Sequence, residues 1–115
     1  MWTDEGIALD ALNAARLVRD FSAGLTAAQF KADITTQSPI LHQMTVLGES
    51  VKRLSTDFRQ AHPSIPWAEI AEMRDRCIRA HDNVNLDVVW NVASRHVPEV
   101  IAYLEQIVPK PPPEA

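Results

Sequence analysis

Residues 40–58 read ILHQMTVLGESVKRLSTDF, and this stretch decides the fold class. Its apolar residues recur at alternating intervals of four and three, a spacing that places side chains on one face of an α-helix. We therefore expect a long helix with an apolar seam of the kind that joins the helices of a bundle. Ser38 and Pro39 predict its start, as an N-cap and first-turn pair. The seam residues are Ile40, Met44, Leu47, Val51, Leu54 and Phe58.

The same spacing occurs nearer the N-terminus and predicts a second long helix, from about Asp4 to Ser22. Gly24 lies just beyond it and is typical of a helix stop. Thr26 can cap a short helix that runs through Ala32. The predicted apolar face of the long helix consists of Ile7, Ala11, Ala14, Val18 and Phe21.

Prolines and asparagines divide the rest of the chain into three further predicted helices. Pro63 and Pro66 interrupt the chain after the long helix, and Pro66 suits a first helical turn, where a missing N–H costs nothing. Asp82, Asn83 and Asn85 mark a turn. The predicted helices cover residues 66–80, 86–95 and 97–107, and Val97-Pro98 either restarts or kinks the chain before the last of them.

Length and composition predict one all-α domain, an up-and-down bundle of four main helices plus shorter ones. The chain has 115 residues, which suits a single domain, assigned here to residues 1–108. Aromatic residues make up only 6% and there are three glycines, whereas sheets favour more aromatic and β-branched residues. The tail, residues 109–115, has four prolines and is expected to be disordered or extended.

Charge and cysteine usage predict a soluble cytoplasmic protein. The single cysteine cannot form an internal disulfide, which fits a reducing compartment. No apolar run reaches 18 residues, and the N-terminus lacks the features of a signal peptide, so no membrane association is expected. The net charge of −4 argues against a general binder of duplex DNA, whose affinity rests on many phosphate contacts.

Positive charge is concentrated in one part of this acidic chain. Residues 65–90 read IPWAEIAEMRDRCIRAHDNVNLDVVW and place Arg74, Arg76, Arg79 and His81 within eight residues. Guanidinium groups can hold and neutralise a phosphate, and an imidazole can exchange a proton near pH 7. This combination suits phosphodiester chemistry without a metal, and no cluster with metal-ligand spacing accompanies it. The alternative is a solvated helix face whose arginines pair with acidic residues of the same chain.

Other chemically capable side chains near this cluster receive structural interpretations. Cys77 falls on the apolar side of the predicted helix, where a buried, unreactive thiol is expected rather than a nucleophile. Trp67 and Trp90 bracket the helix and are expected to pack against it. His62 and His96 lie beside prolines at loop edges and are expected at the surface.

Together, these segments resemble a known family. A long helix followed by HPSIPW (residues 62–67), MRDR (73–76) and LDVVW (86–90) is similar to the HepT-like, or DUF86, branch of the HEPN superfamily, over nearly the whole chain. The resemblance implies a homodimeric helical protein that cuts RNA without a metal or other cofactor, in a composite cleft at the dimer interface. It also implies the toxin role in a type VII toxin–antitoxin pair, with a minimal nucleotidyltransferase as the antitoxin partner.

The resemblance assigns roles residue by residue. The family's catalytic arginine falls on Arg74, and its following polar residue, usually asparagine, falls on Asp75. The family's histidine falls on Arg79, and the tyrosine two residues later falls on His81, so His-x-Tyr becomes Arg79-Ala80-His81. Arg76 and Arg79 are then expected to bind RNA phosphates. Without the tyrosine, an antitoxin partner would have to silence this protein by some means other than modifying that hydroxyl.

The displaced histidine leaves two interpretations. In the first, His81 is the catalytic histidine, because a helix that persisted to residue 81 would place it within roughly 20° of Arg74. In the second, the acid–base group is lost. Three function classes follow: an RNA-cutting toxin, an inactive relative that binds RNA or a nucleotidyltransferase, and a helical scaffold whose basic residues form internal salt bridges.

Overall fold

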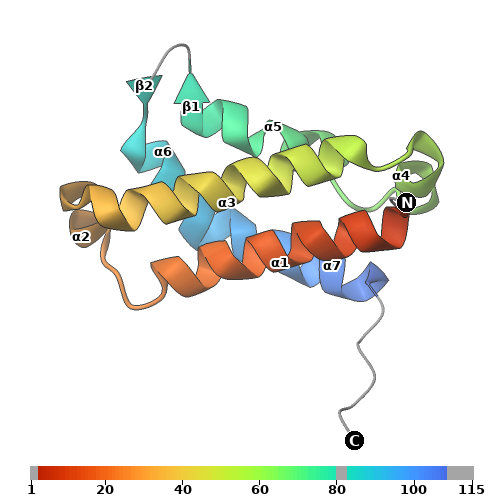
Figure 1. Ribbon diagram of the computed structural model, residues 1–115, viewed down its shortest axis with the longest axis horizontal. Helices are drawn as coiled ribbons and strands as arrows, with labels where there is room; N and C mark the ends of the chain where they lie inside the picture. Colours follow the sequence, from red (N-terminus) through yellow and green to blue (C-terminus); the bar gives the residue numbers. More distant parts are fainter. Residues whose placement is uncertain (1–2, 80–82, 109–115) are drawn as a thin grey trace, which may run out of the picture.

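Four helical segments run alternately up and down in the computed structural model, which describes residues 3–79 and 83–108 (Figure 1). The elements are α1 (Asp4–Ser22), α2 (Ala27–Ala32), α3 (Ile34–Arg53), α4 (Thr56–Ala61), α5 (Trp67–Cys77), β1 (Ile78–Arg79), β2 (Asn83–Val84), α6 (Leu86–Asn91), a π-helix η1 (Val92–His96) and α7 (Val97–Ile107). The main segments are α1, α3, α5 and the run from α6 to α7. The predicted all-α fold is confirmed, with two-residue strands as its only β-structure among the described residues.

One hydrophobic core joins these segments, and α1 and α3 lie at its centre. α1 packs against α3 and α7, and α3 also packs against α5. The predicted seam of α3 is buried: Ile40, Met44, Leu47 and Val51 each have 0% of their surface exposed. Burying each such side chain stabilises the fold by about 1.5–3 kcal/mol, so this seam is the main attachment of α3.

The N-terminal helix α1 has the predicted bounds, with one error in its apolar face. Thr3 caps it by accepting a hydrogen bond from the N–H of Gly6, and Gly24 beyond its end has a φ of +78°, which glycine adopts without strain. Four of the five predicted face residues are buried, but Phe21 is 42% exposed. The reason is that a 4-3 repeat falls behind the true helical period by about 20° every seven residues, which turns Phe21 away from the core.

The predicted start of the long helix at Ser38-Pro39 is wrong, because α3 begins at Ile34. Asp33 is the cap: its Oδ1 accepts a hydrogen bond of 2.9 Å from the N–H of Thr35. Pro39 therefore lies inside the helix. It removes one backbone hydrogen bond, and α3 continues because its buried seam offsets that loss.

The predicted continuation of the long helix to Phe58 is also wrong. α3 ends at Arg53, and Ser55 caps a separate helix, α4, by accepting a hydrogen bond from the N–H of Phe58. The carboxylate of Asp4 accepts hydrogen bonds from both the N–H and the hydroxyl of Ser55, at 2.9 and 2.7 Å. These two bonds lower the pKa of Asp4, and they attach the junction between α3 and α4 to the start of α1.

The motif helix α5 ends earlier than predicted, at Cys77 rather than Ala80. Residues 78 and 79 instead form β1, which pairs antiparallel with β2 at residues 84 and 83. The carbonyl of Cys77 accepts a hydrogen bond of 3.2 Å from the N–H of Asn85. The carbonyls at a helix end need such partners, and here the returning chain provides one. Asn85, which was expected in a turn, also caps α6 by accepting a hydrogen bond from the N–H of Val88.

The predicted break at Val97-Pro98 is a change of helix type. Pro98 has no N–H to donate to Ser94, so a regular α-helix cannot pass through this point unchanged. The N–H of Val97 bonds to the carbonyl of Val92, five residues earlier, and η1 widens the helix there. α6, η1 and α7 therefore follow one another without a loop.

The expected disordered tail, residues 109–115, lies outside the described residues and stays a prediction. Within residues 3–79 and 83–108, no helix has the length and apolar character needed to cross a bilayer.

Gly48 lies where α3 comes closest to α5. A Cβ atom at this position would be 3.2 Å from the carbonyl oxygen of Ala71 and 3.6 Å from the Cβ of Arg74. The first distance is shorter than an ordinary van der Waals contact, and the backbone of α5 cannot turn aside as a side chain can. Gly48 therefore sets the separation of the two helices beside Arg74.

We expect Gly48→Val to destabilise the fold by about 1–3 kcal/mol, measured by urea unfolding, because a Cβ and two methyl groups would enter this contact. Helix propensity alone predicts almost no loss, since glycine is the poorer helix former. Ala102→Val, on the exposed face of α7, is the control and should cost less than about 1 kcal/mol. Equal losses in the two variants would contradict a tight α3–α5 contact.

Candidate functional site

The helix that carries the predicted site, α5, is held firmly at its start and along one side. Ile70, Met73 and Cys77 face the core and are almost fully buried. The indole N–H of Trp67 lies 3.1 Å from the carbonyl oxygens of both Arg59 and His62. The predicted packing role of this tryptophan is confirmed. α5 therefore offers a rigid support for the polar residues on its other sides.

Trp90 has the same structural role at the other end of the motif. Its ring packs on Phe30, with centroids 5.4 Å apart. Phe30 itself has no exposed surface. Trp90 is partly buried and packs against the core, but its ring contact is with Phe30 of α2 rather than with the motif helix against which it was expected to pack.

Arg74 lies on the side of α5 that faces α3. Its Nη1 donates a hydrogen bond of 3.2 Å to Oδ1 of Asp75. Its Nε atom is buried and has no hydrogen-bond partner within the described part of the chain. The side chain is 41% exposed, so the end of the guanidinium reaches solvent while its stem rests against α3. An anion could approach the exposed end of the guanidinium and accept N–H bonds from it, whereas the buried Nε is out of its reach.

Asp75 also links α5 to α3. Its Oδ2 lies 3.9 Å from Nζ of Lys52, which lies 3.9 Å from Oε1 of Glu49. Together with Arg74, these residues form a charge network of two cations and two anions. Every member is about half exposed, so each pair contributes at most about 1 kcal/mol to stability and can be replaced by a stronger partner.

Arg76 points to a different side of α5 from Arg74. Two residues turn an α-helix by about 200°, so the two arginines cannot face the same way within one protomer. Arg76 instead lines a pocket between α5 and α7. The structure therefore separates the predicted phosphate-binding residue Arg76 from the predicted catalytic residue Arg74.

The other two predicted site residues lie at the end of the motif. The backbone of Arg79 belongs to β1 and pairs with that of Asn83, but its side chain is outside the described part of the structure. His81 also falls outside the described residues. Because α5 ends at Cys77, the condition under which Arg74 and His81 would share a helical face is not met.

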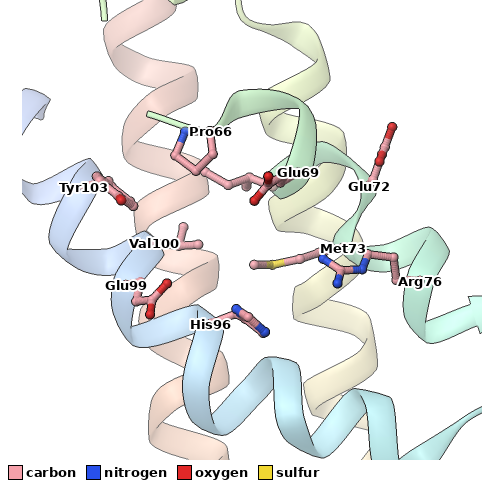
Figure 2. Close-up of a pocket in the computed structure, with 10 residues that line it drawn as sticks. Pro66, Glu69, Glu72, Met73, Arg76, His96, Glu99, Val100 and Tyr103 are labelled. Carbon is pink, nitrogen blue, oxygen red and sulfur yellow. The ribbon is translucent and has the colours of Figure 1, made fainter. Parts of the chain in front are cut away.

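The pocket between α5 and α7 has a volume of about 370 Å³ and a mixed lining (Figure 2). Arg76 and His96 contribute nitrogen atoms, and Glu69 and Glu99 contribute carboxylates, whereas the side chain of Glu72 points away from the pocket. Sequence reasoning placed His96 at the surface, whereas it is half-buried and lines this pocket. The pocket could not be predicted from the sequence, because no sequence pattern shows that α5 and α7 lie next to each other. The lining residues are Pro66, Glu69, Ile70, Glu72, Met73, Arg76, His96, Glu99, Val100 and Tyr103.

Cys77 is buried, as the sequence predicted. It is 1% exposed, and its Sγ lies 3.8 Å from Sδ of Met44. Burial raises the pKa of the thiol to about 11, although the nearby charge of Arg76 acts in the opposite direction. A nucleophilic cysteine needs a thiolate, so Cys77 is not a candidate for catalysis.

Comparison with known proteins identifies a family. The model of the family described as "Ribonuclease HepT-like" matches residues 11–107. A protein of Thermococcus cleftensis named "Probable ribonuclease HepT" is 31% identical over 98 residues, which cover 85% of this chain and 89% of that protein. A Methanocaldococcus jannaschii protein named "Putative RNase" is 31% identical over 99 residues, covering 86% of this chain and 82% of that one. No solved structure gives a significant match.

We expect Cys77 to resist thiol reagents in the folded protein. With a pKa of about 11, roughly one thiol in a thousand is ionised at pH 8, against about one in ten for a pKa of 9.0. Reaction with a disulfide reagent such as DTNB should therefore be slower by a factor of about 100 or more than in urea-unfolded protein. Rapid reaction of the folded protein would show that α5 opens to solvent at Cys77.

Proposed function

Because the chain belongs to the HepT-like ribonuclease family, we propose that it is a metal-independent RNA endonuclease that acts as a homodimer. The proposed cleft lies at the dimer interface and contains Arg74 and His81 from each copy. The proposed biological role is that of the toxin in a type VII toxin–antitoxin pair, neutralised by a minimal nucleotidyltransferase.

The observation that carries this proposal is the state of Arg74. Its stem rests against α3 at Gly48, its side chain is 41% exposed, and Asp75, a half-exposed carboxylate, is its only ion-pair partner among the described residues. A phosphate is a stronger partner for a guanidinium than a half-exposed carboxylate, because it can accept two parallel N–H bonds. Arg74 is therefore positioned in advance to bind an RNA phosphate.

The proposed reaction uses the RNA as its own nucleophile. A histidine removes the proton of a ribose 2′-OH, whose oxygen attacks the adjacent phosphorus. The P–O5′ bond breaks, and a second proton transfer neutralises the departing 5′-oxygen. A homodimeric cleft contains two copies of His81, which could act as base and acid. Arg74 offsets the charge that develops on the phosphoryl oxygens. The products are a 2′,3′-cyclic phosphate and a 5′-OH.

One structural feature favours the alternative, a protein that binds RNA or a nucleotidyltransferase without cutting. The residue beside Arg74 is a carboxylate, Asp75, where an uncharged asparagine is usual in the family. Asp75 contacts both Arg74 and Lys52 and so competes with a phosphate for both cations. The alternative is separated from the main proposal by the cleavage experiment below.

We expect the purified protein to cut single-stranded RNA in EDTA and to leave 2′,3′-cyclic phosphate ends. His81→Ala should lower the rate by about 10²–10⁴-fold, the usual effect of removing a positioned acid–base group. His42→Gln, which changes a histidine on α3 far from the motif in sequence, is the matched control. Light scattering on the same sample should give a dimer.

Three results would contradict the endonuclease proposal to different degrees. A strict monomer that cuts RNA would exclude the composite cleft. The Arg79→His/His81→Tyr variant restores the family's His-x-Tyr pattern. If this variant cuts RNA and the wild type does not, the protein has lost only its acid–base group. If neither protein cuts RNA, the binding role becomes the better account.

We also expect the affinity for single-stranded RNA to depend on salt through Arg74. Arg74→Ala should reduce the slope of log K against log salt concentration by about 0.7, the contribution of one phosphate contact. Arg19→Ala is the matched control, because Arg19 pairs with its neighbour Asp20 at 3.1 Å as Arg74 pairs with Asp75. Asp75→Asn should strengthen binding. Equal slopes for the two alanine variants would assign Arg74 to an internal ion pair.

A further inference from the structure

The pocket between α5 and α7 is separate from Arg74 and has the size of a small-molecule site. Its volume of about 370 Å³ falls in the range of ligand-binding cavities and exceeds what one water or ion needs. Arg76 lies on one wall and His96 on the other, on α5 and at the end of η1 (Figure 2). The pocket therefore lies on the far side of the same helix that carries Arg74.

Charged groups of both signs converge in this pocket. In Figure 2 the side chains of Glu69, Arg76, His96 and Glu99 surround one space, with Met73 inside it, whereas Glu72 is directed away. Within the described part of the chain, the side chains of Glu69, Arg76 and Glu99 make no hydrogen bond or ion pair. Their donors and acceptors are thus available to a ligand that offers both kinds of group.

The π-helix contributes to the orientation of His96. η1 ends at this residue, and π-turns inside α-helices are frequent at functional sites. The amide nitrogen of Asn91 lies 3.4 Å from Nε2 of His96. When the amide donates, Nε2 is the acceptor, and Nδ1 carries the proton and becomes a donor. His96 then adds an N–H donor to the pocket.

The ligand that matches this set is a guanine base. Its O6 and N7 atoms are adjacent acceptors, which a guanidinium binds with two N–H bonds. Its N1–H and N2–H₂ groups are adjacent donors, which one carboxylate accepts together. Its flat faces suit the apolar surface of Met73 and Val100. Adenine lacks both O6 and the N1–H donor, and a free phosphate would be repelled by the glutamates.

We propose that this pocket binds an unstacked guanine of single-stranded RNA, with Arg76 on O6 and N7 and with Glu99 on N1 and N2. The proposal rests on the proposed RNA endonuclease function and names the base that the enzyme selects. Glu99 lies in the first turn of α7.

The test is an NMR titration of the ¹⁵N-labelled protein with guanosine 5′-monophosphate and, separately, with adenosine 5′-monophosphate and inorganic phosphate. The guanosine nucleotide should shift the amide signals of residues 69–76 and 96–103. The adenosine nucleotide should bind more weakly by a factor of about ten or more, and phosphate should leave these signals unchanged. Glu99→Gln should weaken binding of the guanosine nucleotide about tenfold or more, whereas Glu72→Gln, whose side chain points away, should not.

Equal binding of the two nucleotides, shifts elsewhere in the protein, or an unchanged affinity in Glu99→Gln would overturn the guanine assignment. The RNA-cleavage assay is scored independently on the same wild-type preparation. Cleavage without guanosine nucleotide binding would reject the pocket and retain the nuclease. Binding without cleavage would retain the pocket and reject the proposed catalysis.

Discussion

The approach of α3 to α5 at Gly48 is the contact on which the arrangement of the motif depends. α3 is the helix shared by the two halves of the bundle, since it packs against α1 on one side and α5 on the other. Because residue 48 lacks a side chain, the backbone of α5 can lie directly on α3 beside Arg74. The long side chain of Arg74 is then supported by a neighbouring helix, and its position follows from backbone packing rather than from its own weak ion pair.

This arrangement gives the two faces of α5 different chemistry. The face toward α3 carries Arg74 and Asp75 in a charge network whose members largely neutralise one another. The face toward α7 carries Arg76 among carboxylates with which it makes no ion pair in the described structure. The buried stripe of Ile70, Met73 and Cys77 separates them. In the function proposed above, Arg74 would contact a phosphate on one side of this helix and Arg76 a base on the other, as binding of a single-stranded nucleic acid would require.

Helices with strong local signals could be predicted from the sequence, and their ends were predictable only where a local cap decided them. The bounds of α1 followed from its apolar spacing and from Gly24, and α2 followed from Thr26. The end of α3 depends on Asp4, which lies 51 residues from Ser55, so no local pattern could reveal it. The end of α5 likewise depends on a bond from Asn85, beyond the hairpin.

The site shows the same division. The burial of Cys77 could be predicted from the spacing of one helix, because it depends on which side of α5 faces the core. The role of Arg74 was assigned from the family resemblance and stays a prediction. The separation of Arg74 from Arg76 also follows from helical geometry, because residues two apart point to opposite sides of a helix. It was not predicted, because the arginines are close together in the sequence and were treated as one cluster. The place of His96 in the pocket could not be predicted, since the opposite wall is formed by residues 66–76, which lie 20 to 30 positions earlier in the chain.

Because of the π-turn, the number of residues in the segment 92–96 determines how α6 is oriented relative to α7. A π-turn accommodates one residue more than an α-helix would hold at the same place. Deleting a single residue there would rotate α6, and the hairpin joined to it, by about 100° relative to α7. Relatives that differ by one residue in this segment would thus present their motif loops at a different angle on the same bundle. In such proteins, a gap in an alignment would carry as much structural meaning as a substitution.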